Sequence, residues 1–102
     1  MKTLVNNVPN LRVFKVKFIA PTNTRGSRVE IKETKRYNDD KDDKVTLSYS
    51  YEIGDVLEQA LQYLNEKGFE IVARGSEYDH YYVLVNNWGE NFIDLKGNKT
   101  KY

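Results

Sequence analysis

A single amphipathic segment constrains the fold of this chain more than any other feature. Between residues 53 and 64, apolar side chains recur at the spacing of one helix face. Asp55 lies near the start of this segment, where an acidic side chain favours the helix dipole, and Lys67-Gly68 supply a basic last turn and a left-handed cap. An apolar helix stripe must be buried, so the rest of the chain has to provide an apolar surface. The stripe consists of Ile53, Val56, Leu57, Ala60, Leu61 and Leu64.

The segments on either side of this helix have the two-residue period of β-strands with one buried face. Phe14, Val16 and Phe18 alternate with lysines within residues 11–20. Similar strand patterns occur in residues 28–33, 45–51, 69–74 and 80–85, and a short apolar run follows at residues 92–95. We therefore predict an α+β fold in which one helix packs on one face of an antiparallel sheet of about five strands, in the order βββαββ.

Length and composition are those of one globular domain. The chain has 102 residues, of which 39% are hydrophobic and 13% aromatic, enough for a single core. We expect a flexible N-terminal arm at residues 1–10, one domain at residues 11–95 and a polar C-terminal tail at residues 96–102. The sequence lacks cysteine and any apolar run of the length that a membrane span or a secretory signal needs, which predicts a cytoplasmic protein.

The turn after the first predicted strand, "PTNTRGSR" at residues 21–28, is too long for a two-residue hairpin and too polar for a core. One interpretation is purely structural: Thr, Asn and Ser bond to nearby backbone, and Gly26 adopts a positive φ. The other is functional. Arg25 and Arg28 flank Gly26-Ser27, and two guanidinium groups beside small hydroxyls and an accessible amide can hold a phosphate or a carboxylate.

The stretch "APTNTRGSRVEIK", followed by "YEIGDVLEQALQYLNEKGFEIV", resembles a group of small proteins, without an assigned activity, encoded by bacteriophages and other mobile elements of bacteria. The resemblance covers most of residues 11–85. Its specific part is residues 22–28 together with their spacing to residues 68–72. The resemblance implies a bacterial or phage origin, and it assigns no role to any residue.

Catalytic chemistry is not expected from these residues. His80 lies beside Asp79 and near Ser76, but residues so close within one hairpin do not converge as a nucleophilic triad requires. The charged run at residues 38–44 lacks the glycine and the terminal glutamate of a calcium loop. We expect neither a metal site nor a cofactor.

Two functions stay open, and residues 1–44 carry an excess of Lys and Arg that is relevant to both. The first is a non-enzymatic binding protein that recognises a protein partner through the arginine turn and an aromatic sheet face. The second is a single-stranded nucleic-acid-binding protein, with bases stacked on that face and phosphates held by basic side chains. An exposed outer strand also leaves a homodimer open. The phosphate-binding set is Arg12, Lys15, Lys17 and Arg28; the candidate binding residues are Arg25, Gly26, Ser27, Arg28, Tyr49, Tyr51, Tyr82 and Trp88.

Overall fold

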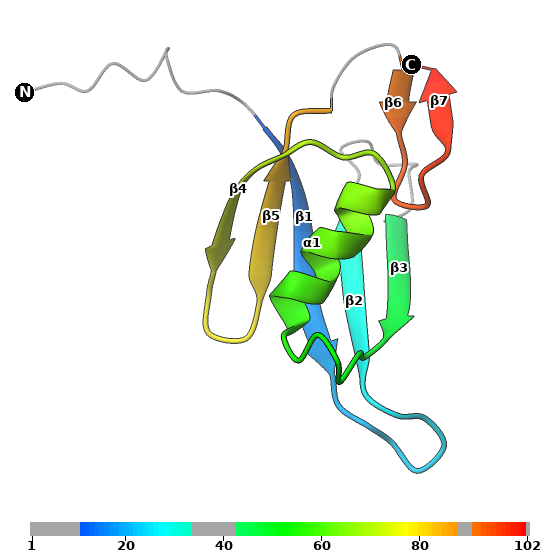
Figure 1. Cartoon of the computed structure of the whole chain (residues 1–102), viewed down its shortest axis with the longest axis vertical. Coiled ribbons are helices and arrows are strands. Elements are labelled where there is room, and N and C mark those ends of the chain that lie inside the picture. The colour runs from blue at the N-terminus through cyan, green and yellow to red at the C-terminus, as the bar shows by residue number, and fades with distance from the viewer. Residues whose placement is uncertain (1–10, 34–42, 88–90, 102) are drawn as a thin grey trace, which may run out of the picture.

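The computed structural model describes residues 11–33, 43–87 and 91–101. The predicted N-terminal arm, most of the charged run at residues 38–44, and Trp88 lie outside these ranges. Within them the chain forms an α+β fold whose elements follow one another as shown in Figure 1. They are β1 (Arg12–Ile19), β2 (Arg28–Glu33), β3 (Asp43–Ser48), α1 (Val56–Glu66), β4 (Ile71–Ser76), β5 (Tyr81–Val85), β6 (Asn91–Ile93) and β7 (Lys99–Lys101).

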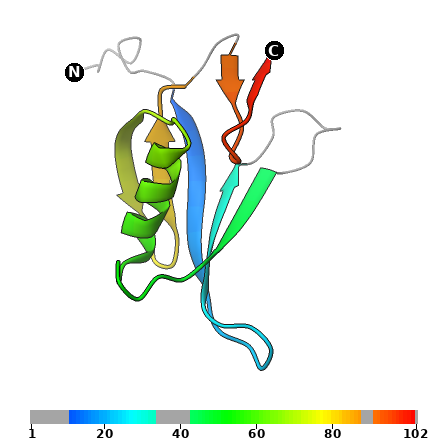
Figure 2. The same cartoon turned by 45° about the vertical axis from the view of Figure 1, so that its right-hand side comes forward.

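The main sheet has five antiparallel strands in the spatial order β3-β2-β1-β5-β4. Strand β1 is central, because it pairs with β2 along one edge and with β5 along the other. The chain passes from edge strand β3 through α1 to the opposite edge strand β4, so the helix lies across one face of the sheet (Figures 1 and 2). This arrangement confirms the predicted α+β class and the order βββαββ.

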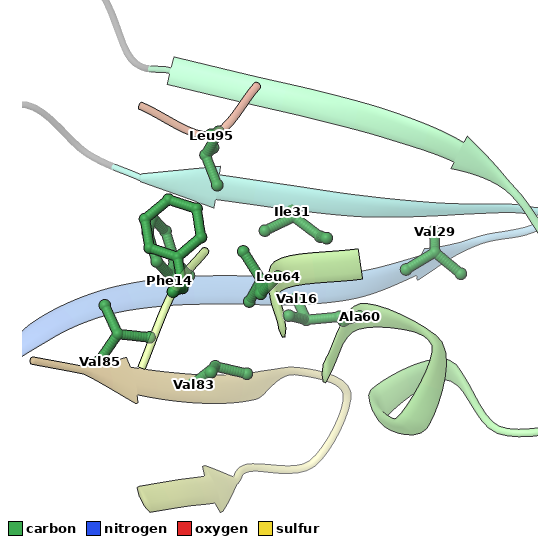
Figure 3. Packing of buried hydrophobic residues seen from close by; sticks show 10 residues of the cluster. Phe14, Val16, Val29, Ile31, Ala60, Leu64, Val83, Val85 and Leu95 are labelled. Carbon is green, nitrogen blue, oxygen red and sulfur yellow. The ribbon is translucent and has the colours of Figure 1, made fainter. Parts of the chain in front are cut away.

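The core lies between α1 and the sheet (Figure 3). Alternate residues of β1, β2 and β5 point toward the helix, and Ala60 and Leu64 of α1 are fully buried against them. Leu57 and Leu61, predicted as equal members of the stripe, are only partly buried at the margin of this cluster. The fully buried strand residues are Phe14, Val16, Val29, Ile31, Val83 and Val85.

Helix α1 begins three residues later than the apolar period predicts. Asp55 is the N-cap, and its carboxylate accepts a hydrogen bond of 3.0 Å from the Leu57 amide, which satisfies one of the free donors of the first turn. Ile53 therefore lies in the preceding turn and not in the helix, a correction to the predicted stripe. At the other end Gly68 adopts a φ of +99°, which confirms the predicted left-handed cap.

The C-terminal segment forms a second small sheet, in which β6 and β7 pair as a hairpin. Residues 99–101 were predicted to be part of a polar tail, because a run without apolar residues carries no strand period. Leu95, in the turn of this hairpin, is fully buried. Its carbonyl accepts from the Tyr63 hydroxyl at 2.9 Å and its amide donates to the Asp43 carboxylate at 3.4 Å, so the turn is anchored to both α1 and β3. Burial, together with the charges of Asp94 and Asp43, raises the pKa of Tyr63.

Candidate nucleic-acid interface

The face of the sheet opposite α1, called here the outer face, is covered by no described helix or strand (Figure 2). Successive side chains of a strand point to opposite faces, so the residues between the buried apolar ones lie on the outer face. In β1, β2 and β3 these outward positions include five basic residues and one acidic residue, Glu30, and the others, among them the exposed Val13, are uncharged. The basic residues are Lys15, Lys17, Arg28, Lys32 and Lys44.

Three of these residues form a straight row across the strands. Lys15 is the register partner of Lys32, and Lys32 is the partner of Lys44. Residues paired in this way point to the same face, and neighbouring strands are about 4.8 Å apart, so the three residues span roughly 10 Å. Like charges placed directly opposite one another destabilise a sheet. This lysine row, Lys15, Lys32 and Lys44, places three cationic side chains side by side on the outer face, where a bound anion would contact them.

Beyond the lysine row, the outer face continues toward the loop that joins β1 to β2. Lys17 is paired with Glu30, which offsets part of the positive charge. Arg28, at the start of β2, is partly buried, and its Nε is buried with no hydrogen-bond partner among the described residues. The rest of its guanidinium adds a further positive charge at this end of the outer face.

Tyr82 lies next to the lysine row at the end opposite Lys44, because it is the register partner of Lys15 on β5. Its hydroxyl donates a hydrogen bond to the carboxylate of Glu77. This hydrogen bond is the main cause that raises the pKa of Tyr82, and burial adds to it. The ring is partly buried. Tyr82 therefore lies on the basic face, as a sequence-predicted binding residue, but its polar end is already engaged.

Tyr49 and Tyr51 lie elsewhere, so the predicted tyrosines do not form one aromatic sheet face. Strand β3 ends at Ser48, before both of them. Tyr49 continues the helix-side alternation of β3 and packs against the core, with its ring 5.7 Å from that of Phe18 and 5.0 Å from that of Tyr51. Phe18 is 42% and Tyr51 81% exposed. Trp88 lies outside the described residues.

The arginine turn is part of an exposed loop at residues 20–27, called here the β1–β2 loop. Two hydrogen bonds close its tip: the Thr22 amide donates to the Arg25 carbonyl at 2.7 Å, and the Arg25 amide donates to Thr22 Oγ1 at 3.1 Å. At its base the Ser27 carbonyl accepts from the Tyr49 amide at 3.0 Å. Gly26 does not have the positive φ that the sequence predicted, because the Thr22–Arg25 turn closes the loop without it.

Arg12 was grouped with the lysines, and the structure corrects this. It is 1% exposed and lies on the helix side of β1. Its Nε and Nη2 donate to the two Glu33 carboxylate oxygens at 2.6 and 2.8 Å, and its guanidinium lies 5.0 and 5.2 Å from the ring centroids of Phe14 and Phe69. Arg12 is therefore a structural residue, and Lys32 and Lys44 join the outer face in its place.

The described part of the chain was also searched for side chains that could support catalysis or bind a metal ion. His80 Nδ1 lies 2.6 Å from the Asp79 carboxylate, while Ser76 is paired with Tyr81 in the β4–β5 hairpin. Within residues 11–33, 43–87 and 91–101, no three His, Asp or Glu side chains are placed to share a metal ion. In the same ranges, no helix combines the length and the apolar composition that crossing a membrane requires.

Within the described residues, the chain is a two-layer α+β protein in which α1 covers one face of the sheet and the other face carries the lysine row. No known protein family, curated protein or solved structure matches the chain. Any functional inference therefore depends on the placement of its own residues.

Proposed function

We propose that this is a non-enzymatic nucleic-acid-binding protein that holds the phosphate backbone on its outer face. The observation that carries the proposal is the lysine row, Lys15, Lys32 and Lys44, in register across three adjacent strands of a face that no described helix or strand covers. Phosphates are contacted mainly by Lys and Arg side chains, and release of counterions from the nucleic acid drives such binding.

The low net charge of +1 is compatible with this function, because the outward positions of β1, β2 and β3 carry five basic residues against one acidic residue, Glu30. The exposed acids Glu58 and Glu66 belong to α1, on the opposite side of the sheet from the lysine row. A local field of one sign attracts a charged partner regardless of the charge on the far side, once the distance exceeds the Debye length of about 8 Å at physiological salt.

A protein partner, the first function that the sequence left open, has one observation in its favour. The exposed rings of Phe18 and Tyr51 both pack against Tyr49, whose amide bonds to the base of the β1–β2 loop, and clustered exposed aromatic side chains are typical of protein contacts. This surface lacks the in-register charge of the outer face. It is the function to pursue if nucleic acid does not bind.

The double variant Lys15→Ala/Lys44→Ala is expected to weaken binding to DNA and to lower its salt dependence. Both side chains are exposed and lie on either side of Lys32. Each lost phosphate contact reduces the slope of log K against log salt by about one, so the slope should fall by about two. Fluorescence anisotropy of a labelled DNA, titrated at several salt concentrations, measures both quantities.

The matched control is Arg74→Ala/Lys96→Ala. It removes the same net charge from two exposed residues, one on the helix side of β4 and one in the β6–β7 turn. We expect the control to bind like the wild type. If both double variants weakened binding equally, the overall charge of the protein and not the outer face would attract DNA. If the wild-type protein did not bind DNA at micromolar concentration and low salt, the proposed function would be wrong.

Glu30→Gln is expected to have the opposite effect and to strengthen DNA binding. The carboxylate is the register partner of Lys17 and shares the outer face with Arg28 and Lys32, so it repels any phosphate held there. Removing one like charge near the surface is worth roughly 1 kcal/mol, or about fivefold in affinity. The same anisotropy titration tests this, with Glu58→Gln on α1 as control. Unchanged or weaker binding by Glu30→Gln would contradict a phosphate site at this position.

A further inference from the structure

We infer that the bound nucleic acid is double-stranded DNA, and that the β1–β2 loop enters one of its grooves with Arg25 directed at the base edges. This inference rests on the proposed function and adds the form of the nucleic acid and a second contact. It replaces the single-stranded ligand that the sequence suggested.

The first argument concerns base stacking. Proteins that bind single strands without sequence preference combine a basic groove with aromatic rings on which successive bases stack. In the described part of the outer face the lysine row is accompanied by one aromatic residue, Tyr82, whose ring is partly buried and whose hydroxyl is bound to Glu77. Phe18 and Tyr49 lie on the helix side. The described part of the basic face can therefore hold phosphates but offers unpaired bases little surface.

The second argument is the shape of the β1–β2 loop. It projects beyond the end of the sheet in both views (Figures 1 and 2), and residues 20–26 are exposed. Residues 22–25 form its closed tip, so the loop reaches less than the ~14 Å that four fully extended residues would span. The major groove of B-form DNA is about 8.5 Å deep and about 12 Å wide and admits a two-stranded ribbon. The size of the loop is therefore comparable with the depth of the groove.

The third argument is the chemistry at the tip of the loop. Asn23 and Arg25 carry side chains that pair with adenine and guanine edges in the major groove, and the hydrogen bonds between Thr22 and Arg25 fix the tip before binding. A tip that is already ordered loses less conformational entropy on binding. The major groove of A-form RNA is narrow and closed to side chains, which favours DNA over an RNA duplex.

The last argument is continuity between the two contacts. Arg28 is the first residue of β2 after the loop and is on the outer face with Lys32, two strand positions from Glu30. A duplex whose backbone crosses the lysine row would thus meet a further cation before its groove reaches Arg25.

The test compares Arg25→Ala with the wild type by fluorescence anisotropy on three labelled ligands of one sequence: a DNA duplex of about two helical turns, its single strand and the RNA duplex. We expect the wild type to prefer the DNA duplex. Arg25→Ala should bind that duplex about tenfold more weakly, the effect of one lost base-edge contact, with no change on the single strand. Arg74→Ala is the matched arginine control, and Thr22→Val, which removes the hydroxyl that fixes the tip, should weaken duplex binding in the same direction.

The outcomes separate the two proposals. If Lys15→Ala/Lys44→Ala weakens binding but Arg25→Ala leaves duplex affinity unchanged, the outer face binds nucleic acid and the loop inference is wrong. Preference of the wild type for single-stranded DNA or for the RNA duplex would also overturn the inference alone. If no ligand binds, the proposed function fails together with it. Arg25 is exposed, so an unchanged melting temperature of the variant should accompany each result.

Discussion

Replacing Glu33 by alanine is expected to lower the free energy of unfolding by about 3–5 kcal/mol. Glu33 is the last residue of β2, and its carboxylate receives both hydrogen bonds of a bidentate pair with the buried Arg12 guanidinium. The variant leaves Arg12 buried among the rings of Phe14 and Phe69 without the carboxylate that balances its charge. Breaking such a pair costs more than the pair itself contributes, because the remaining charge is still desolvated.

Urea denaturation followed by circular dichroism measures this effect. The control is Glu30→Ala on the same strand, whose carboxylate lies on the outer face, and we expect a loss of at most about 1 kcal/mol there. The double variant Arg12→Met/Glu33→Leu, which replaces both charges by apolar side chains, should recover most of the stability. A Glu33→Ala protein as stable as the wild type would show that the pair does not anchor the end of β1 to β2.

Replacing Leu64 by alanine is expected to cost about 2–5 kcal/mol, and Leu64→Asp should abolish cooperative unfolding. Leu64 is fully buried in the cluster that joins α1 to the sheet (Figure 3). Truncation leaves a cavity that the rigid sheet can fill only in part, and an aspartate would place a carboxylate among apolar side chains. The helix has few other fully buried apolar residues in its described length, so its docking depends strongly on this one.

Thermal and urea melts of Leu64→Ala, Leu61→Ala and Gln62→Ala form a graded series on one helix. Leu61 is partly buried and should cost less than Leu64, and the exposed Gln62 should cost almost nothing. If Leu61→Ala and Leu64→Ala were equally destabilising, the helix would be rotated relative to the packing described above. A cooperative melt of Leu64→Asp close to that of the wild type would contradict the packing altogether.

The fold was largely predictable because its elements repeat at clear periods. The alternation of Phe14 and Val16 with lysines identifies β1, and the 3.6-residue spacing that ends at Leu64 identifies α1. The helix start was not predictable from period alone: Ile53 continues the apolar spacing, but the Asp55 cap and the positive φ of Gly54 begin the helix after it. Strand β7 has no apolar residue, and only its pairing with β6 identifies it.

The candidate site was predictable only in part, because a face is a property of several strands together. Lys15 and Lys17 were identified as outward-facing from one strand, but the lysine row requires the register that brings Lys32 and Lys44 beside Lys15. Arg12 was expected to be exposed because arginine is charged. The residues next to it in the sequence do not indicate that it pairs with Glu33, which lies on the next strand. Tyr49 and Tyr51 follow the β3 alternation in sequence, yet the strand ends before them.

Strand β1 lies in the centre of the sheet, and its residues point alternately into the core and onto the outer face. Inserting or deleting a single residue within it would exchange the two sets, turning Lys15 and Lys17 inward and Phe14 and Val16 toward water. Changes in the number of residues at positions 20–27 leave that alternation intact. A change of length in β1 would therefore impair both folding and ligand affinity. A change of length in the β1–β2 loop would spare the fold and alter only the contact that the loop makes.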